Sequence, residues 1–558
     1  MSGTESAAQQ EARMAAKVAL KEAKRAARKE AKRADRAARR KGVTYQEEAK
    51  FDAAGQMKRA NSAAWRKEKS ERNKATGGYN GSRKSDRNID NRKNGNATAE
   101  EEMEARLDTA IEFIKVNKKH LGAVIEDFLQ VNDPRHQSYI IYSVPELMLF
   151  GLLTFMFHAE SKRSSNARLS PVLLRNINEF FPQIEKFPHA DTLGNFLREI
   201  DADEVEEVKL KLFARLNRSK VLDAFKINGA LHFVIDGVHK LTLDYKWCQN
   251  ALVKKVSGKS EEDKLYFAYA VELSILLPDG HTLPVMTEFI DRTKYGDCGT
   301  DTAKAKQDCE TNAAKRLITR FRARFPCLRM ALTADGLYAT GPMLHLCQEK
   351  RIDLMFTLQD KSLPSVWEEV HAHMASGMHG ERPFRELNGV GQVFRYVNDI
   401  AYEYGVEKRH ITVHVAICEE SRREFDQKTG TVETAKSTFA WLSLRRFSDR
   451  NVERRCNAEG RPRWSIEHQN RIEKHDGYAY SHCFSYDWEA MRTYHFLMQI
   501  AYILNMLTLL STKFAPIVKA RGFAQTIRYL WLIFDGAILD HEAMRERMPG
   551  TYQIRWAI

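Results

Sequence analysis

The chain has 558 residues and a formal net charge of +14, and its length allows two or three domains with a sizeable core. The charge is uneven, because residues 1–98 hold 26 Lys and Arg against 12 Asp and Glu, leaving 62 of each for the remainder. Eight scattered cysteines, without a C-x-x-C pair or zinc-finger spacing, exclude a disulfide framework and a zinc finger, and we expect no secretory signal.

The first 98 residues are rich in Ala, Lys, Arg and Glu and then in Gly, Asn and Ser. Such a composition buries too little apolar surface to offset the entropy of ordering, so we predict a disordered basic arm over 1–98. Residues 12–41 have high helix propensity, which favours a transient cationic helix. Attraction to nucleic-acid phosphates is the functional interpretation of the arm, and a solubilising tail is the alternative.

A helical domain is predicted over 99–225. Apolar residues recur at three- and four-residue spacing in ARLDTAIEFIKVNKKHLGAVIEDFL and PELMLFGLLTFMF. The two most apolar runs, 144–158 and 494–510, are shorter than a membrane span and carry polar residues, so we expect buried core helices. Nothing in 99–225 resembles a catalytic constellation.

An α/β domain is predicted from residue 226 to residue 360. The expected elements are a strand at LHFVID (231–236), a hairpin formed by YFAYAVELSILL and HTLPVMTEFI around Pro278-Asp279-Gly280, a helix over 301–325, a strand at LRMALTAD (328–335), a helix across GPMLHLCQEKR and a strand at DLMFTLQ (353–359). This order, β-β-β-α-β-α-β, is the plan of a ribonuclease-H-like mixed sheet. The final helix of that plan is expected later in the chain.

A β-rich insertion over 361–460 follows, with strand-like runs at VFRYVND, HITVHVAIC and STFAWLSLRRF. We expect the second part of the core, with C-terminal helices, over 461–558. Its first helix is predicted over 462–476, because Pro462 suits a first helical position and Gly477 suits the residue after the end.

Two aspartates end predicted neighbouring strands, Asp236 the first and Asp335 the fourth. Adjacent strands lie about 4.8 Å apart, so both carboxylates can converge on one edge of the sheet. Acids that converge repel one another unless cations are bound, which predicts a site for two Mg²⁺ or Mn²⁺ ions. The alternative is that each Asp-Gly pair is an ordinary turn at a strand end.

The helix over 462–476 supplies the third acid. At 3.6 residues per turn Arg463, Glu467 and Lys474 share one face, so Glu467 is expected to join the metal ligands while the two cations hold DNA phosphates. Glu473 is the fallback for the third carboxylate. The alternative is a solvated face of intrahelical ion pairs.

These residues resemble the DDE transposases of bacterial insertion sequences, in the group with a β-rich insertion and the signature Y-x2-R-x3-E-x6-K. Arg463, Glu467 and Lys474 match three positions, whereas Gly460 stands at the tyrosine position. FVIDG and LTADGLYA resemble the strands of the two aspartates, and the resemblance covers roughly 100–558. It implies cut-and-paste transposition of the element's own DNA, DNA binding by the helical domain, and a homodimer at synapsis on the terminal inverted repeats.

Other residues have weaker assignments. Lys361 is a candidate DNA contact, or a surface lysine. Trp367, Trp441 and Trp464 are candidates for stacking on an extruded base, with packed core tryptophans as the alternative. A repurposed DNA-binding protein without catalysis and a ribonuclease-H-like nuclease are the competing functions. The resemblance implies a cytoplasmic, nucleoid-associated enzyme, or a nuclear one in a eukaryotic host.

Overall fold

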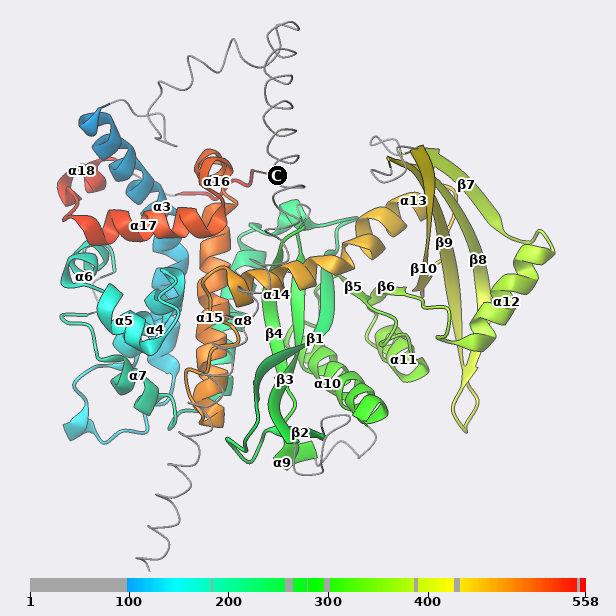
Figure 1. The fold of residues 1–558 in the computed structure, drawn as a ribbon, viewed down its shortest axis with the longest axis horizontal. Helices are drawn as coiled ribbons and strands as arrows, with labels where there is room; N and C mark the ends of the chain where they lie inside the picture. The colour runs from blue at the N-terminus through cyan, green and yellow to red at the C-terminus, as the bar shows by residue number, and fades with distance from the viewer. Residues whose placement is uncertain are drawn as a thin grey trace, which may run out of the picture. The chain divides into compact units, whose positions relative to one another are not determined.

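The structure is a computed structural model that describes residues 98–181, 184–255, 264–277, 280–295, 302–385, 390–425, 432–548 and 552–557. These residues form a mixed α/β structure around a ten-stranded sheet, with helices packed beside and across it (Figure 1). The predicted basic arm lies outside the described residues except for Thr98. So do Pro278 and Asp279 of the predicted hairpin turn.

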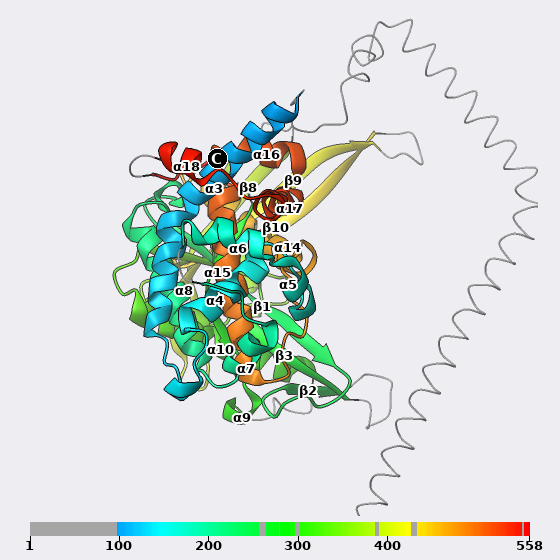
Figure 2. The same ribbon diagram turned by 90° about the vertical axis from the view of Figure 1, so that its left-hand side faces the viewer.

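A group of helices from both ends of the chain forms one part of the molecule. α15 (Trp488–Leu509) is its centre and contacts α3 (Ala99–Asp127), α4 (Val144–Met156) and α8 (Ala202–Arg218). Figure 2 shows these helices side by side. The remaining helices of this part are α5 (Lys162–Arg168), α6 (Pro171–Asn178), α7 (Ala190–Phe196), α16 (Ala515–Arg521), α17 (Phe523–Gly536) and α18 (His541–Glu546). Nearly every residue of α15 is buried, which explains its apolar sequence, and none of the helices in the described ranges is long and apolar enough to cross a membrane.

The first half of the sheet, β1 to β6, contains both antiparallel and parallel strand pairs. β1 (Leu231–Leu243), β3 (Lys264–Leu276) and β4 (Thr282–Phe289) are successive antiparallel neighbours, and β2 (Leu252–Lys255) pairs with the start of β3. On its other side β1 is parallel to β5 (Met330–Ala334), which is parallel to β6 (Asp353–Thr357). The strand order is therefore β4-β3-β1-β5-β6. Connections of the parallel pairs run through α10 (Thr302–Arg324), preceded by the short α9 (Arg292–Tyr295), and through α11 (Gly341–Glu349).

The sheet continues with strands from the region after β6. β7 (Gly380–Arg385), β8 (Gly391–Tyr404), β9 (Arg409–Phe425) and β10 (Val432–Ser443) are antiparallel neighbours, and α12 (Pro364–Ala375) packs on β8. β10 joins β6 through only two residue pairs, Trp441 with Thr357 and Leu442 with Phe356. This narrow junction links the two halves of one sheet.

α10 and α14 (Ser465–His475) cover opposite faces of β1. Val234 forms a buried cluster with Leu276 and with Ile466 of α14. The ring of its neighbour Phe233 lies 5.1 Å from that of Phe321 in α10. Successive side chains of a strand point to opposite faces, so the even-numbered residues of this part of β1 point toward α14. Figure 1 shows α14 crossing the sheet.

The helical segment that ends in α14 begins earlier than predicted. α13 (Val452–Arg454), a π-helical turn (Arg455–Gly460) and a 3₁₀ turn (Arg461–Trp464) lead into α14. The predicted start at Pro462 is therefore wrong. Pro462 lies in the 3₁₀ turn, where the change of helix type already interrupts the i to i−4 hydrogen-bond ladder, so its missing N–H is tolerated.

Candidate functional site

Asp236 lies in β1 and has a perturbed carboxyl group. Burial, the nearby charge of Asp335 and that of Glu310 raise its pKa from 3.8 to about 7. The N–H of Gly237, 3.0 Å from Asp236 Oδ1, and the charge of Arg463 act in the opposite direction. A carboxyl group with this pKa has lost much of its hydration and lies among like charges.

Asp335 directly follows β5 and stands level with Asp236. The parallel pairing of β1 with β5 runs from Leu231 opposite Met330 to Val234 opposite Thr333. Two residues beyond the last pair on each strand come Asp236 and Asp335, so both occupy the same level and point to the same face. The Asp335 side chain also accepts a hydrogen bond from the N–H of Leu337, at 2.9 Å, which fixes the turn that follows.

The helical segment over 452–475 lies on the face to which both aspartates point. Val234, two residues before Asp236, packs on Ile466 of α14. Thr333, two residues before Asp335, donates through Oγ1 to the carbonyl of Glu459 at 3.0 Å. The predicted third acid is therefore on a helix that packs against the same face of both strands.

Glu467 is in the first turn of α14 and is paired with Arg463. The Arg463 guanidinium lies 3.0 Å from Glu467 Oε1; the glutamate side chain is 45% exposed and the arginine side chain only 10%. Arg463 is thus paired with solvent-facing Glu467, and its charge also lowers the pKa of half-buried Asp236. The intrahelical pair that the sequence allows is formed, and its cation also acts on the first aspartate.

Lys474 and Glu473 lie farther along α14, against a second group of charges. The Nζ of Lys474 is 5.6 Å from the ring centre of Tyr480, and the hydroxyl of Tyr480 donates to buried Glu272 at 2.8 Å. Glu473 is fully buried beside Glu272 and Lys240, and burial followed by the charge of Glu272 raises its pKa well above the ordinary value. Glu473 therefore belongs to a buried polar cluster that differs from the Asp236–Asp335 pair.

Lys361 is exposed close to the turn after Asp335. It lines a small cavity of about 370 Å³ together with Gly336 and Leu337 of that turn and with Tyr404. The structure thus brings Lys361 near the turn after Asp335, although the two residues follow different strands, β6 and β5.

Gly460, at the tyrosine position of the signature, faces an occupied space. A Cβ added to Gly460 would lie 2.6 Å from Nε1 of Trp441. Trp441 itself is buried, whereas Trp464 is 63% exposed with the Arg463 guanidinium 4.4 Å from its ring centre. Trp367 donates its Nε1–H to the carbonyl of Gln359 at 2.9 Å. Of the three tryptophans, Trp464 has the accessible ring.

Glu310 is the residue of this region that sequence reasoning missed. It lies in α10, is buried, and its charge is among the causes that raise the pKa of Asp236. Its position in the sequence did carry a signal. The buried residues Ala313, Ala314 and Leu317 follow at helical spacing, so Glu310 is an acid in the apolar stripe of an amphipathic helix.

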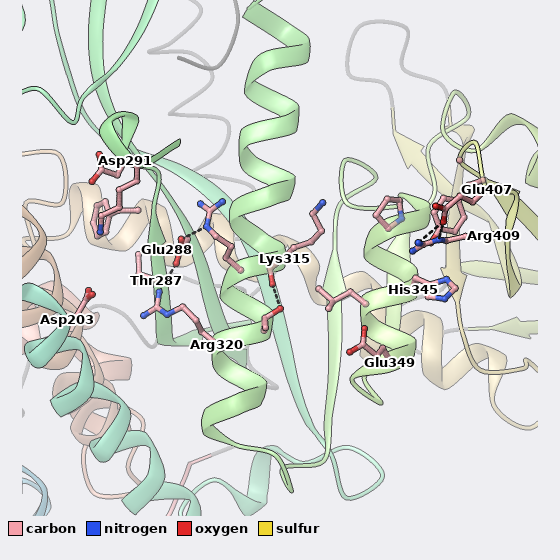
Figure 3. A pocket seen from close by; sticks show the side chains of 18 of the residues that line it. Asp203, Thr287, Glu288, Asp291, Lys315, Arg320, His345, Glu349, Glu407 and Arg409 are labelled. Carbon is pink, nitrogen blue, oxygen red and sulfur yellow. Dashed lines mark hydrogen bonds and ion pairs between the residues drawn. The ribbon is translucent and has the colours of Figure 1, made fainter. Parts of the chain in front are cut away.

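A separate cavity is lined by residues of β4, α10, α11 and the turn joining β8 to β9 (Figure 3). It has a volume of about 930 Å³ and is lined by both signs of charge. Arg316 and Arg320 both bind Glu288, at 2.7 and 2.6 Å, and Arg409 binds Glu407 at 2.8 Å. Because these charges satisfy one another and neither aspartate lines the cavity, we assign the candidate chemistry to the aspartate pair.

The residues around Asp236 fit a hard divalent cation by their chemistry. Carboxylate oxygens are the ligands that Mg²⁺ and Mn²⁺ prefer, and the raised pKa of Asp236 reflects like charges that a cation would offset. Among the described residues no three His, Cys, Asp or Glu side chains are grouped closely enough to hold one ion. Comparison with known protein families found no match, and comparison with curated proteins found none either.

Proposed function

We propose that this chain is a DNA strand-cleaving and strand-joining enzyme of the DDE transposase type, with Asp236, Asp335 and Glu467 as its acids. One observation carries the proposal. Asp236 in β1 and Asp335 directly after the parallel neighbour β5 stand at the same level of the sheet, where the helical segment that bears Glu467 packs on one face of both strands. The sequence signature around Arg463, which was defined without reference to these contacts, agrees with that arrangement.

The sheet supports a ribonuclease-H-like core as the scaffold. Across the sheet, the antiparallel strands β4, β3 and β1 are followed by β5 and β6, which are parallel to β1. Along the chain, α10 lies between β4 and β5. That is the order expected from the sequence for this fold. On this interpretation the strands β7 to β10 belong to the insertion before the acid-bearing helix.

The three acids would hold the divalent ions, and Glu467 has the exposure needed to turn toward them. When bound, such ions activate a water or a 3′-hydroxyl and stabilise the leaving oxygen of an in-line phosphodiester displacement. The chain's own residues provide the rest. Asp236 and Asp335 fix one side of the site from rigid strands, and Arg463 lies within reach of both Asp236 and Glu467 to neutralise a phosphate.

DNA is the proposed substrate, in the form of the inverted repeats at the ends of the element and a target duplex. Lys361, close to the turn after Asp335, and Lys474, farther along the acid-bearing helix, are proposed phosphate contacts, with the basic arm over 1–98 adding sequence-independent affinity. A homodimer that pairs two ends is part of the same proposal, as is a nucleoid-associated location.

The test is Mg²⁺-dependent cleavage of DNA that carries the inverted repeats flanking the coding region. We expect cleavage at the repeat ends and strand-transfer products in a plasmid assay. Asp236→Asn and Asp335→Asn should each abolish both products, since either change removes a charged ligand. Asp244→Asn is the matched control, because Asp244 is exposed directly after the far end of β1 and should leave cleavage intact.

The competing functions give different products. A protein that only binds DNA would retard the repeats and cleave nothing at any Mg²⁺ concentration. A ribonuclease-H-like nuclease would give hydrolysis without strand transfer. Either result would overturn the transposase proposal.

A further inference from the structure

Glu310 joins two segments that flank the candidate acids. Its Oε2 accepts a hydrogen bond from the hydroxyl of Tyr269 in β3 at 2.5 Å, and its Oε1 accepts one from the hydroxyl of Tyr338 at 2.9 Å. Tyr338 lies in the turn that follows Asp335, and all three side chains are buried. A single carboxylate of α10 therefore links β3 to the turn after β5.

The same carboxylate lies directly against β1. A Cβ added to Gly237 would lie 2.6 Å from the Cδ of Glu310, so only a glycine lets the carboxyl group approach the strand this closely. Gly237 is the residue after Asp236, and its missing side chain is on the face toward α10, opposite to the face of Asp236. Glu310 thus packs against the backbone next to Asp236, from the α10 face of the sheet.

The second contact reaches Asp335 through one residue. The N–H of Tyr338 donates to the carbonyl of Asp335 at 3.2 Å, while the hydroxyl of Tyr338 is held by Glu310. The Glu310 side chain therefore contacts the backbone beside Asp236 directly and the backbone of Asp335 through Tyr338. Both contacts lie on the α10 face of the sheet, opposite to the face of Asp236. Hydrogen bonds to a charged acceptor are stronger than those to a neutral one. The two tyrosine contacts of the Glu310 carboxylate are therefore suited to keep the distance between Asp236 and Asp335 constant.

We propose that Glu310 is a positioning residue that sets the separation of Asp236 and Asp335 through its contacts with Gly237, Tyr269 and Tyr338. The inference rests on the proposed function, because it takes the two aspartates as the metal ligands. Glu310 itself stays on the α10 face, with both oxygens bound by hydroxyl groups, and acts through the aspartates.

The two tyrosine contacts make the variants distinguishable. Glu310→Gln keeps an acceptor for one hydroxyl and a donor for the other, so the link between the segments survives. Glu310→Ala removes the link and leaves both hydroxyls without this acceptor. The pair Tyr269→Phe with Tyr338→Phe removes the link while keeping the carboxylate. Tyr494→Phe is the control for losing a buried tyrosine hydroxyl, because that hydroxyl has no hydrogen-bond partner in the described part of the chain.

Hydrogen exchange of the full-length, metal-free chain tests the link without using activity. In Glu310→Ala the amides of Gly237, Leu337 and Tyr338 should exchange about tenfold faster, because the turn after β5 opens more often once its support is lost. The double tyrosine variant should match it. Glu310→Gln and Tyr494→Phe should stay within about threefold of the wild-type rates. Unchanged exchange in Glu310→Ala would overturn the inference.

Mn²⁺ titration, followed by calorimetry, tests the consequence for the metal site. Glu310→Ala and the double tyrosine variant should each weaken Mn²⁺ binding about tenfold, and combining all three changes should add nothing, because residues of one unit are not additive. If Glu310→Gln were as harmful as Glu310→Ala while the double tyrosine variant bound normally, the charge would matter and the positioning role would be wrong.

The two proposals fail separately. If the wild-type chain binds no Mn²⁺ but Glu310→Ala still speeds exchange at Leu337, the metal-dependent function is wrong and the positioning contact stands. If the wild type binds Mn²⁺ and Glu310→Ala changes neither exchange nor affinity, the function stands and the positioning role is wrong.

Discussion

Replacing Asp236 by Asn should stabilise the metal-free fold, increasingly so as the pH rises. The pKa of Asp236 is about 7 in the fold, against 3.8 ordinarily, because of burial and the charges of Asp335 and Glu310. Between these two values the folded chain retains a proton that the unfolded chain has lost, so the free energy of unfolding falls as pH rises and levels off above pH 7. At about 1.4 kcal/mol per pKa unit, the charged carboxylate costs the fold about 4 kcal/mol at pH 8.

The Asn variant lacks this dependence. Its advantage over the wild type should grow by about 2–3 kcal/mol between pH 5 and pH 8, measured by urea unfolding in EDTA with circular dichroism. Asp244→Asn, at an exposed position directly after β1, should follow the wild type at every pH. Equal pH dependence in Asp236→Asn and the wild type would refute the claim that burial and neighbouring carboxylates raise the pKa of Asp236.

Three further predictions concern the third acid, the signature and the arm. Glu467→Ala should abolish strand cleavage and change stability by less than about 1 kcal/mol, because Glu467 is half-exposed, whereas retained cleavage would remove Glu467 from the catalytic acids. Gly460→Tyr should lower the thermal unfolding midpoint, because the new side chain displaces Trp441, and an unchanged midpoint would show that the space is open. Deleting residues 1–98 should weaken nonspecific DNA binding and flatten its salt dependence in fluorescence anisotropy; if neither changes, the arm is a spacer.

The strands of the core were predictable because each is a short apolar run that ends in polar residues. LHFVID is confirmed as part of β1, and the first five residues of the predicted strand DLMFTLQ form β6, which ends at Thr357. The continuation of β1 to Leu243 was not predicted, because its outer part contains His239 and Lys240, which are unusual in a buried strand. Its pairing with β3 continues past a bulge after His239, which shows that long-range contacts decided the strand's length.

The site was only partly visible in the sequence for the same reason. Asp236 and Asp335 could be predicted because each is an acid that ends an apolar, strand-like run. Once β1 and β5 are taken as parallel neighbours, the two aspartates are expected at the same level of the sheet. Such a pattern cannot find Glu310, which lies in the middle of a helix and reaches Gly237 through a contact between distant residues. An acid in an apolar helical stripe is a sign of such a contact, but its partners appear only in three dimensions.

The start of the acid-bearing helix was misplaced by an otherwise sound rule. Proline at a first helical position is common, and Pro462 was interpreted in that way. The segment is helical from Val452 because a π turn and a 3₁₀ turn accommodate the proline. Gly460 lies at the end of the π turn, against Trp441, so the departure from the signature and the irregular helix occur at one place.

The most direct test of the account is a crystal of the chain soaked in Mn²⁺ and measured for anomalous scattering. We expect an anomalous peak in contact with the carboxylates of Asp236 and Asp335 on the face covered by α14, and no peak there in crystals of Asp335→Asn. Manganese bound only at other places, with both aspartates well ordered and uncoordinated, would contradict the account.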